Sequence, residues 1–75
     1  MSETQEIEAA VMRLLAGKTT PQEPAEVIEN LAIKYEPWLV RQAIWSLTAK
    51  GAAELTWDRK LQLGPYSGRE IAVAA

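Results

Sequence analysis

The stretch that decides the fold is residues 37–50, PWLVRQAIWSLTAK, because it carries two different faces at helical spacing. Side chains three or four residues apart lie on the same side of an α-helix. One face is small and aliphatic and predicts a buried stripe, formed by Val40, Ala43, Ile44 and Leu47. The opposite face predicts a surface that contacts another molecule, formed by Trp38, Arg41, Gln42 and Trp45.

A β-hairpin is predicted directly after this helix. Gly51 ends the helix, and the following residues, AAELTWDRKLQLG (52–64), alternate between apolar and polar types as paired strands do. A three-residue turn at residues 58–60 places all four large apolar residues of the hairpin on one face, whereas a two-residue turn mixes the faces. The predicted cross-strand pairs are Trp57 with Leu61 and Leu55 with Leu63, which makes Trp57 a core residue of the hairpin.

The first helix is predicted over residues 3–16. Ser2 and Gln5 have the spacing of a capping box, and Gly17 can end the helix in a left-handed conformation. Apolar side chains recur between these signals at intervals of three or four, at Ile7, Ala10, Val11, Leu14 and Leu15.

The second helix has two possible starts, after an N-cap at Thr20 or at Pro24. It is expected to end near Tyr35, because the next residue precedes a proline and is disfavoured in the α-helical region. The predicted buried stripe contains Ala25, Ile28, Leu31, Ala32 and Tyr35, with Val27 at its edge. The connection to the third helix is then very short, which predicts a steep crossing, as in a helix-turn-helix.

The composition of the 75 residues favours one small folded domain, because 48% of the residues are hydrophobic and 24% are charged. We expect an ordered core at about residues 3–64 and a tail at residues 65–75, in which residues 70–73 form a short strand or stay loose. No run approaches the roughly 20 apolar residues that span a bilayer. The N-terminus is acidic and has no signal-peptide pattern, which predicts a cytoplasmic protein.

Catalysis finds little support in the sequence. The chain has no cysteine and no histidine, which removes disulfides, the commonest metal ligands and the commonest general base. It has no glycine-rich phosphate loop, and its glutamates stand at positions expected to form a solvated helix face. We therefore expect neither an enzyme nor a cofactor.

The net charge of −2 is unevenly divided. Residues 1–37 contain three basic and seven acidic residues, which gives −4, whereas residues 38–75 contain five basic and three acidic residues, which gives +2. The positive half contains the displayed helix face and the hairpin. This half is a possible phosphate-binding surface, although scattered surface charge also serves solubility alone.

The order of elements resembles the winged helix-turn-helix family. The similarity covers about residues 5–64 and rests on the third helix and the hairpin. The residues that carry it are Val40, Ala43, Ile44, Leu47 and Gly51, followed by Glu54-Leu55-Thr56, Asp58-Arg59 and Leu61-Gln62-Leu63. The resemblance implies an α+β fold in which a three-helix bundle is followed by a hairpin wing.

The resemblance also implies binding of double-stranded DNA, with the third helix in the major groove and the wing on the backbone or minor groove. Arg41 and Gln42 have the donors that read guanine and adenine, and basic residues near them suit phosphates. The expected DNA contacts are Trp38, Arg41, Gln42, Trp45, Lys50, Arg59 and Lys60. A specific site would require a dimer or a partner, since so few contacts bind weakly.

An alternative interpretation is a protein-interaction module, either a homodimer or an adaptor, that uses Trp38 and Trp45. The acidic balance and the two displayed tryptophans favour it, because aromatic residues beside arginine are typical of interface hot spots. Structural roles also stay open at this stage. Trp45 can pack under the hairpin or under the C-terminal tail, Trp38 can cap the helix-turn-helix corner, and Arg41 can pair with Glu36 or Glu54.

Overall fold

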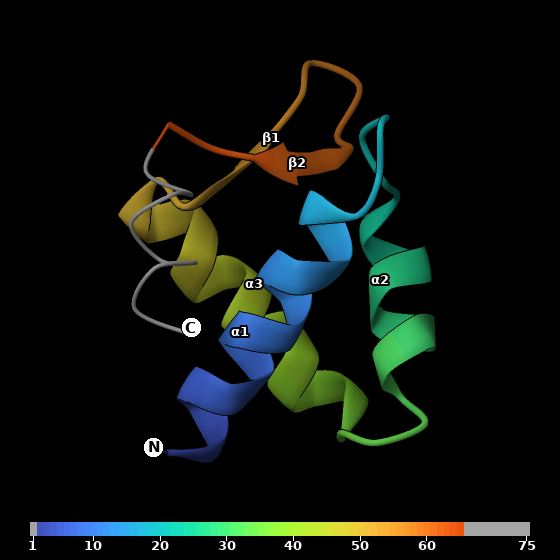
Figure 1. Ribbon diagram of the computed structural model, residues 1–75, viewed down its shortest axis with the longest axis vertical. Helices are drawn as coiled ribbons and strands as arrows, with labels where there is room; N and C mark the ends of the chain where they lie inside the picture. Colours follow the sequence, from blue (N-terminus) through green and yellow to red (C-terminus); the bar gives the residue numbers. More distant parts are fainter. Residues whose placement is uncertain (1, 66–75) are drawn as a thin grey trace.

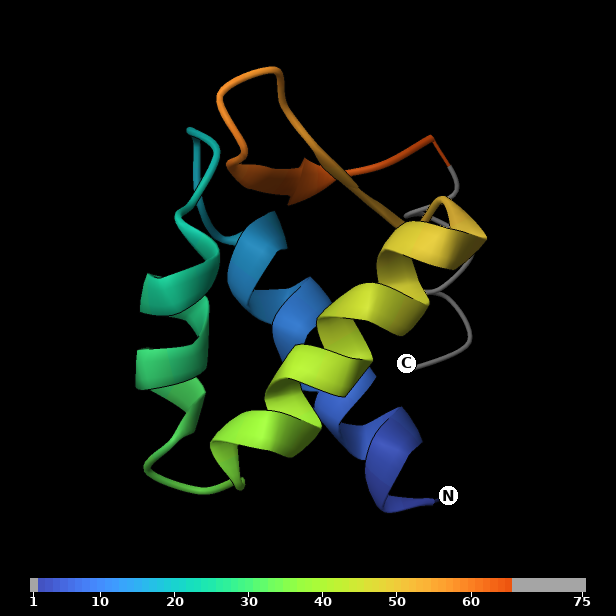
Figure 2. The same ribbon diagram turned by 180° about the vertical axis from the view of Figure 1, so that it is seen from behind.

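The computed structural model, which describes residues 2–65, contains three helices followed by a two-stranded antiparallel sheet, an α+β winged-helix-like arrangement. The sheet lies across the end of the bundle where α1 ends, α2 begins and α3 ends (Figure 1). Seen from behind, α3 crosses in front of α1, with α2 beside them (Figure 2). The elements are α1 (Glu3–Ala16), α2 (Pro24–Leu31), α3 (Pro37–Lys50), β1 (Ala53–Leu55) and β2 (Leu61–Leu63). The predicted tail beyond Pro65 lies outside the described residues.

Helix α1 has the predicted bounds, and both hydrogen bonds of its capping box are present. The Gln5 backbone N–H donates to Ser2 Oγ, and the Ser2 N–H donates to Gln5 Oε1, each at 3.2 Å. Gly17 ends the helix as predicted, but with φ −82°, so the prediction of a left-handed conformation there was wrong. At this end of the helix, the Gly17 N–H donates to the carbonyls of Arg13 and Leu14, at 3.1 and 3.2 Å.

Helix α2 differs from its prediction in length and in phase. It begins at Pro24, the second of the two predicted starts, and ends at Leu31. Val27, expected at the edge of the stripe, is its one fully buried residue, whereas Ala25 and Ala32 are exposed. The apolar residues of this short helix form one broad side, with Val27 and Ala25 at its two edges, and packing against α1 and α3 buried the Val27 edge.

The α2–α3 turn, residues 32–36, replaces the predicted last turn of α2. The backbone N–H groups of Lys34 and Tyr35 both donate to the carbonyl of Leu31, at 3.1 and 2.8 Å. Tyr35 is half-buried, and its hydroxyl donates to Glu6 Oε1 on α1 at 3.2 Å, which ties the turn to the first helix. Glu36 is extended, with φ −62° and ψ 132°, as a residue before proline should be.

Helix α3 matches its prediction in bounds and in buried stripe. Gly51 at its end has φ 79°, a left-handed conformation that costs a glycine little and other residues more. The stripe packs mainly on α1, and Leu61 of β2 closes the core above it. The buried core contains Ile7, Val11, Met12 and Leu15 of α1, Val27 of α2, Val40, Ala43, Ile44 and Leu47 of α3, and Ala52, Ala53 and Leu61 of the hairpin region.

The hairpin is present, but its predicted register was wrong by two residues. Its loop is Trp57-Asp58-Arg59, one residue earlier than predicted, and Leu55 lies opposite Leu61. A shift of two keeps every side chain on its face, so the apolar alternation could not distinguish the two registers.

Hydrogen bonds from side chains and from outside the hairpin decided the register. Thr56 and Lys60 pair across the loop, with the Thr56 N–H donating to the Lys60 carbonyl at 2.8 Å and the Lys60 N–H donating to Thr56 Oγ1 at 3.0 Å. Gln22, just before α2, bridges Leu61 through two backbone hydrogen bonds of 2.8 and 2.6 Å. β2 is therefore flanked on both sides, and among residues 2–65 β1 forms the outer edge.

Within residues 2–65, no helix is both long enough and apolar enough to cross a bilayer.

Candidate functional site

The predicted displayed face of α3 is exposed to solvent. Trp38 and Trp45 are 58% and 65% exposed, and Arg41 and Gln42 are exposed as well. Arg41 stands three residues after the first tryptophan and four before the second, so the three side chains form one continuous row along the helix. The alternative in which Trp45 packs under the hairpin was wrong. The ion pairs within residues 2–65 are Lys34–Glu6 and Lys50–Glu8. The proposed pairing of Arg41 with Glu36 or Glu54 is therefore not formed.

An open groove of about 500 Å³ runs between α2, α3 and β1, and we call it the α3 groove. Arg41 is the one charged residue in its lining, and the Thr48 hydroxyl donates to the Trp45 carbonyl at 2.8 Å. The remaining lining consists of apolar side chains, so a ligand in the groove would make mainly apolar contacts. Its lining residues are Pro24, Ala25 and Ile28 of α2, Arg41, Ile44, Trp45 and Thr48 of α3, and Leu55 of β1.

Of the groove lining, the sequence predicted the exposure of Arg41 and Trp45 but not the groove itself. Ile28 was assigned to the buried stripe of α2, and Leu55 to the hairpin core. In the structure Ile28 is half-buried and Leu55 is exposed, so both reach the groove wall. A correct helical phase for α2 would have placed Ile28 beside α3, but nothing in the sequence alone brings β1 to the same place.

The loop of the hairpin, which we call the wing tip (residues 57–59), displays the most exposed large hydrophobic side chain among the described residues. Trp57 is 96% exposed, so its predicted place in the hairpin core was wrong. The Arg59 N–H donates to the Thr56 carbonyl at 2.9 Å, and Arg59 has φ 63°. This is the pattern of a three-residue hairpin loop whose last residue is left-handed. The Thr56 hydroxyl also donates to the Asp58 carboxylate, so the loop that displays Trp57 is well held.

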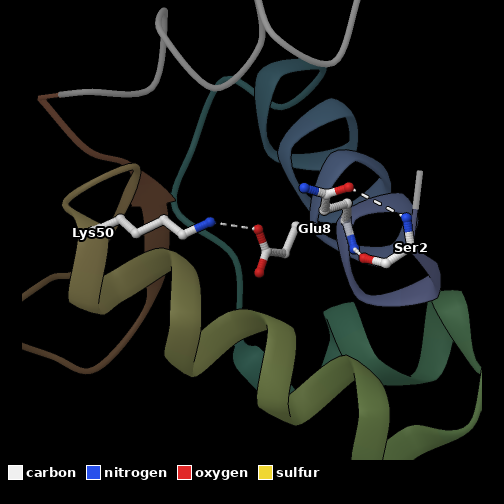
Figure 3. Close-up of polar contacts among 4 residues, drawn as sticks. Ser2, Glu8 and Lys50 are labelled. Carbon is white, nitrogen blue, oxygen red and sulfur yellow. Dashed lines mark hydrogen bonds and ion pairs between the residues drawn. The ribbon is translucent and has the colours of Figure 1, made fainter.

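The basic residues predicted to bind DNA lie on different elements and differ in exposure. Arg41 lies on α3 and Arg59 at the wing tip, and both are exposed, whereas Lys60 is partly buried at the base of the loop. Lys50 reaches toward α1 instead of the row of Arg41, and its ammonium donates to Glu8 Oε1 at 2.7 Å (Figure 3).

Glu8 is the exception to the predicted solvated face of glutamates. Its side chain is only 7% exposed, whereas the Lys50 side chain is 45% exposed. Removing a carboxylate from water is costly unless a partner compensates the charge, and Lys50 supplies that compensation. The pair therefore joins the end of α3 to the middle of α1 and has a structural role.

Among residues 2–65, four of the five exposed large hydrophobic residues belong to α3 or the hairpin, and the fifth, Ile33, lies in the α2–α3 turn. Exposed apolar side chains that form a contiguous patch are typical of an interaction surface. The four are Trp38, Trp45, Leu55 and Trp57.

Comparison with protein-family models, with curated proteins and with solved structures found no match. A functional assignment for this chain therefore depends on its own residues and their arrangement.

Proposed function

We propose that this domain is a protein-interaction module, and that its α3 groove binds an apolar segment of a protein partner. The observation that carries the proposal is the apolar groove bordered by the exposed ring of Trp45. Concave apolar sites with a few polar groups are the usual form of a binding site. Exposed tryptophan beside arginine is the composition of residues that dominate binding energy at protein interfaces.

Charge supports a protein partner over a polyanion. The chain has a net charge of −2, and Arg41 is the one charged residue of the groove lining. The Lys50 ammonium already contacts Glu8, which leaves it poorly placed to neutralise a ligand on the other side of α3. Interface centres are depleted of charge and rich in aromatic residues, and this surface has both properties.

A Trp45→Ala variant should lose partner binding. The indole forms one wall of the groove, and truncating a central aromatic anchor typically weakens a complex by about 30-fold or more. The measurement is affinity capture with equal amounts of folded wild-type and variant protein, after nuclease treatment, followed by titration with the purified partner.

The matched control for this experiment is Ile33→Ala. Ile33 is 94% exposed but lies outside the groove lining, so its removal should leave capture unchanged. Equal recovery of the same partners by all three proteins would overturn the proposal.

Double-stranded DNA is a second candidate ligand, favoured by the exposure of Arg41 and Gln42 on α3 and of Arg59 on the wing tip. Arginine and glutamine can each form bidentate contacts to a base edge in the major groove. With three phosphate contacts, duplex affinity should fall about 40-fold between 50 and 200 mM salt. Fluorescence anisotropy with a labelled duplex measures this slope, and Arg59→Ala on the wing tip should flatten it. Absence of binding at low salt would remove this candidate.

A further inference from the structure

We propose that the occupant of the α3 groove is the wing tip of a second copy of this chain, with Trp57 inserted between α2 and α3. This inference rests on the proposed function and names its partner. It begins from Trp57, which is 96% exposed although the loop that carries it is well ordered by hydrogen bonds. A large aromatic ring fixed in water is an anchor that loses little conformational freedom on binding.

The groove and the ring match in size and in chemistry. The groove has a volume of about 500 Å³ and an almost entirely apolar lining. An enclosed tryptophan buries on the order of 200 Å², which is an area that a groove of this size can cover. Trp45 forms one wall, so the inserted indole would meet a second indole there, and aromatic pairs of this kind add to the energy of simple burial.

The charges beside the ring are complementary to the charges beside the groove. Asp58 follows Trp57 directly, and Arg41 is the charged residue of the groove lining. On the α2 side, Glu23 directly precedes the groove residue Pro24 and is exposed. It offers a partner to Arg59, the last residue of the wing tip. An inserted wing tip would thus place its carboxylate toward α3 and its guanidinium toward α2.

The position of the wing tip within each chain allows a closed dimer. Leu55 lines the groove and Trp57 follows two residues later, so the groove and the wing tip are neighbours in one molecule. A two-fold axis beside the hairpin can then place each wing tip in the other groove at the same time. Such an interface is self-complementary, forms two identical contacts and stops at two subunits.

The first test compares wild type, Trp57→Ala and Ile33→Ala by sedimentation equilibrium from micromolar to millimolar protein. We expect wild type and Ile33→Ala to dimerise with the same dissociation constant and Trp57→Ala to dimerise at least about 30-fold more weakly. Because both residues are more than nine-tenths exposed, neither change should disturb the fold, and circular dichroism checks this.

The second test reverses the proposed charge pair. Asp58→Arg and Arg41→Asp should each weaken the dimer, and the double variant should recover at least part of the loss, because the pair is restored with its charges exchanged. Additive losses in the double variant would contradict the pairing of these two residues.

Two results would overturn the inference about the wing tip without deciding the proposed function, which the capture experiment tests separately. If wild type stays monomeric throughout, or if Trp57→Ala dimerises like wild type, the wing tip does not fill the groove. Trp45-dependent capture of a different protein would in that case still support the interaction module. Loss of both the dimer and that capture would reject the two proposals together.

Discussion

Replacing Gly64 with alanine is expected to lower the free energy of unfolding by about 3 kcal/mol. Gly64 is buried where the chain leaves β2, and its N–H donates to the Ala52 carbonyl at 2.9 Å. An alanine Cβ there would overlap the carbonyl oxygen of Gly51 and come within 3.0 Å of its carbonyl carbon. The backbone of Gly51 cannot rotate away as a flexible side chain can. The end of β2 must therefore move away from the end of α3.

The matched control is Gly17→Ala at the end of α1. An added Cβ there meets only the carbonyl oxygens of Arg13 and Leu14, at 3.6 and 3.7 Å, which is ordinary contact. Because φ at Gly17 is −82°, alanine can adopt the same conformation, and the change should be neutral or stabilise by about 0.5 kcal/mol. Urea denaturation of both variants measures the difference. Equal unfolding free energies for the two variants would contradict the close approach of Gly64 to Gly51.

Leu61→Ala is expected to cost about 3 kcal/mol of unfolding free energy, from lost burial and from the cavity left behind. Leu61 is fully buried, and β2 that carries it packs on α1. A domain of this size has a total stability of roughly 4–11 kcal/mol, so this single change would remove a large share of it.

The control for Leu61 is its cross-strand partner, Leu55. The two residues are the same type, sit opposite each other and differ in burial, since Leu55 is 47% exposed. Leu55→Ala should therefore cost only about 1 kcal/mol. Thermal or urea unfolding at low protein concentration is the suitable measurement, because dimerisation would add concentration-dependent stability. A larger loss for Leu55 than for Leu61 would contradict the structure of the hairpin.

Helices α1 and α3 could be predicted from local signals. In α1 a capping box, a terminal glycine and one apolar stripe agree with each other. In α3 a proline at the first position, a terminal glycine and one apolar stripe agree. The bounds and buried faces of both helices therefore follow from spacing alone. The exposure of Trp38, Arg41 and Trp45 follows for the same reason, since a helix that buries one face displays the opposite one.

Helix α2 and the hairpin could not be predicted in the same way. In α2, the apolar side is broad, and only contact with the other helices chose its Val27 edge for the core. In the hairpin, registers that differ by two residues have the same alternation, and the pairing of Gln22 with Leu61 is a contact between distant parts of the chain. For this reason Trp57 was predicted in the hairpin core, whereas the structure places it at the wing tip.

By itself, the sequence determined three helices and a hairpin in a winged-helix order, the two faces of α3 and the absence of cysteine and histidine chemistry. Only the tertiary structure decided the α3 groove, the use of Lys50 to neutralise the buried Glu8, and the display of Trp57 beside the groove. The physical reason is that helix faces are set by spacing along one segment. Grooves, ion pairs between helices and strand register depend on which segments meet, and that depends on the packing of the whole chain.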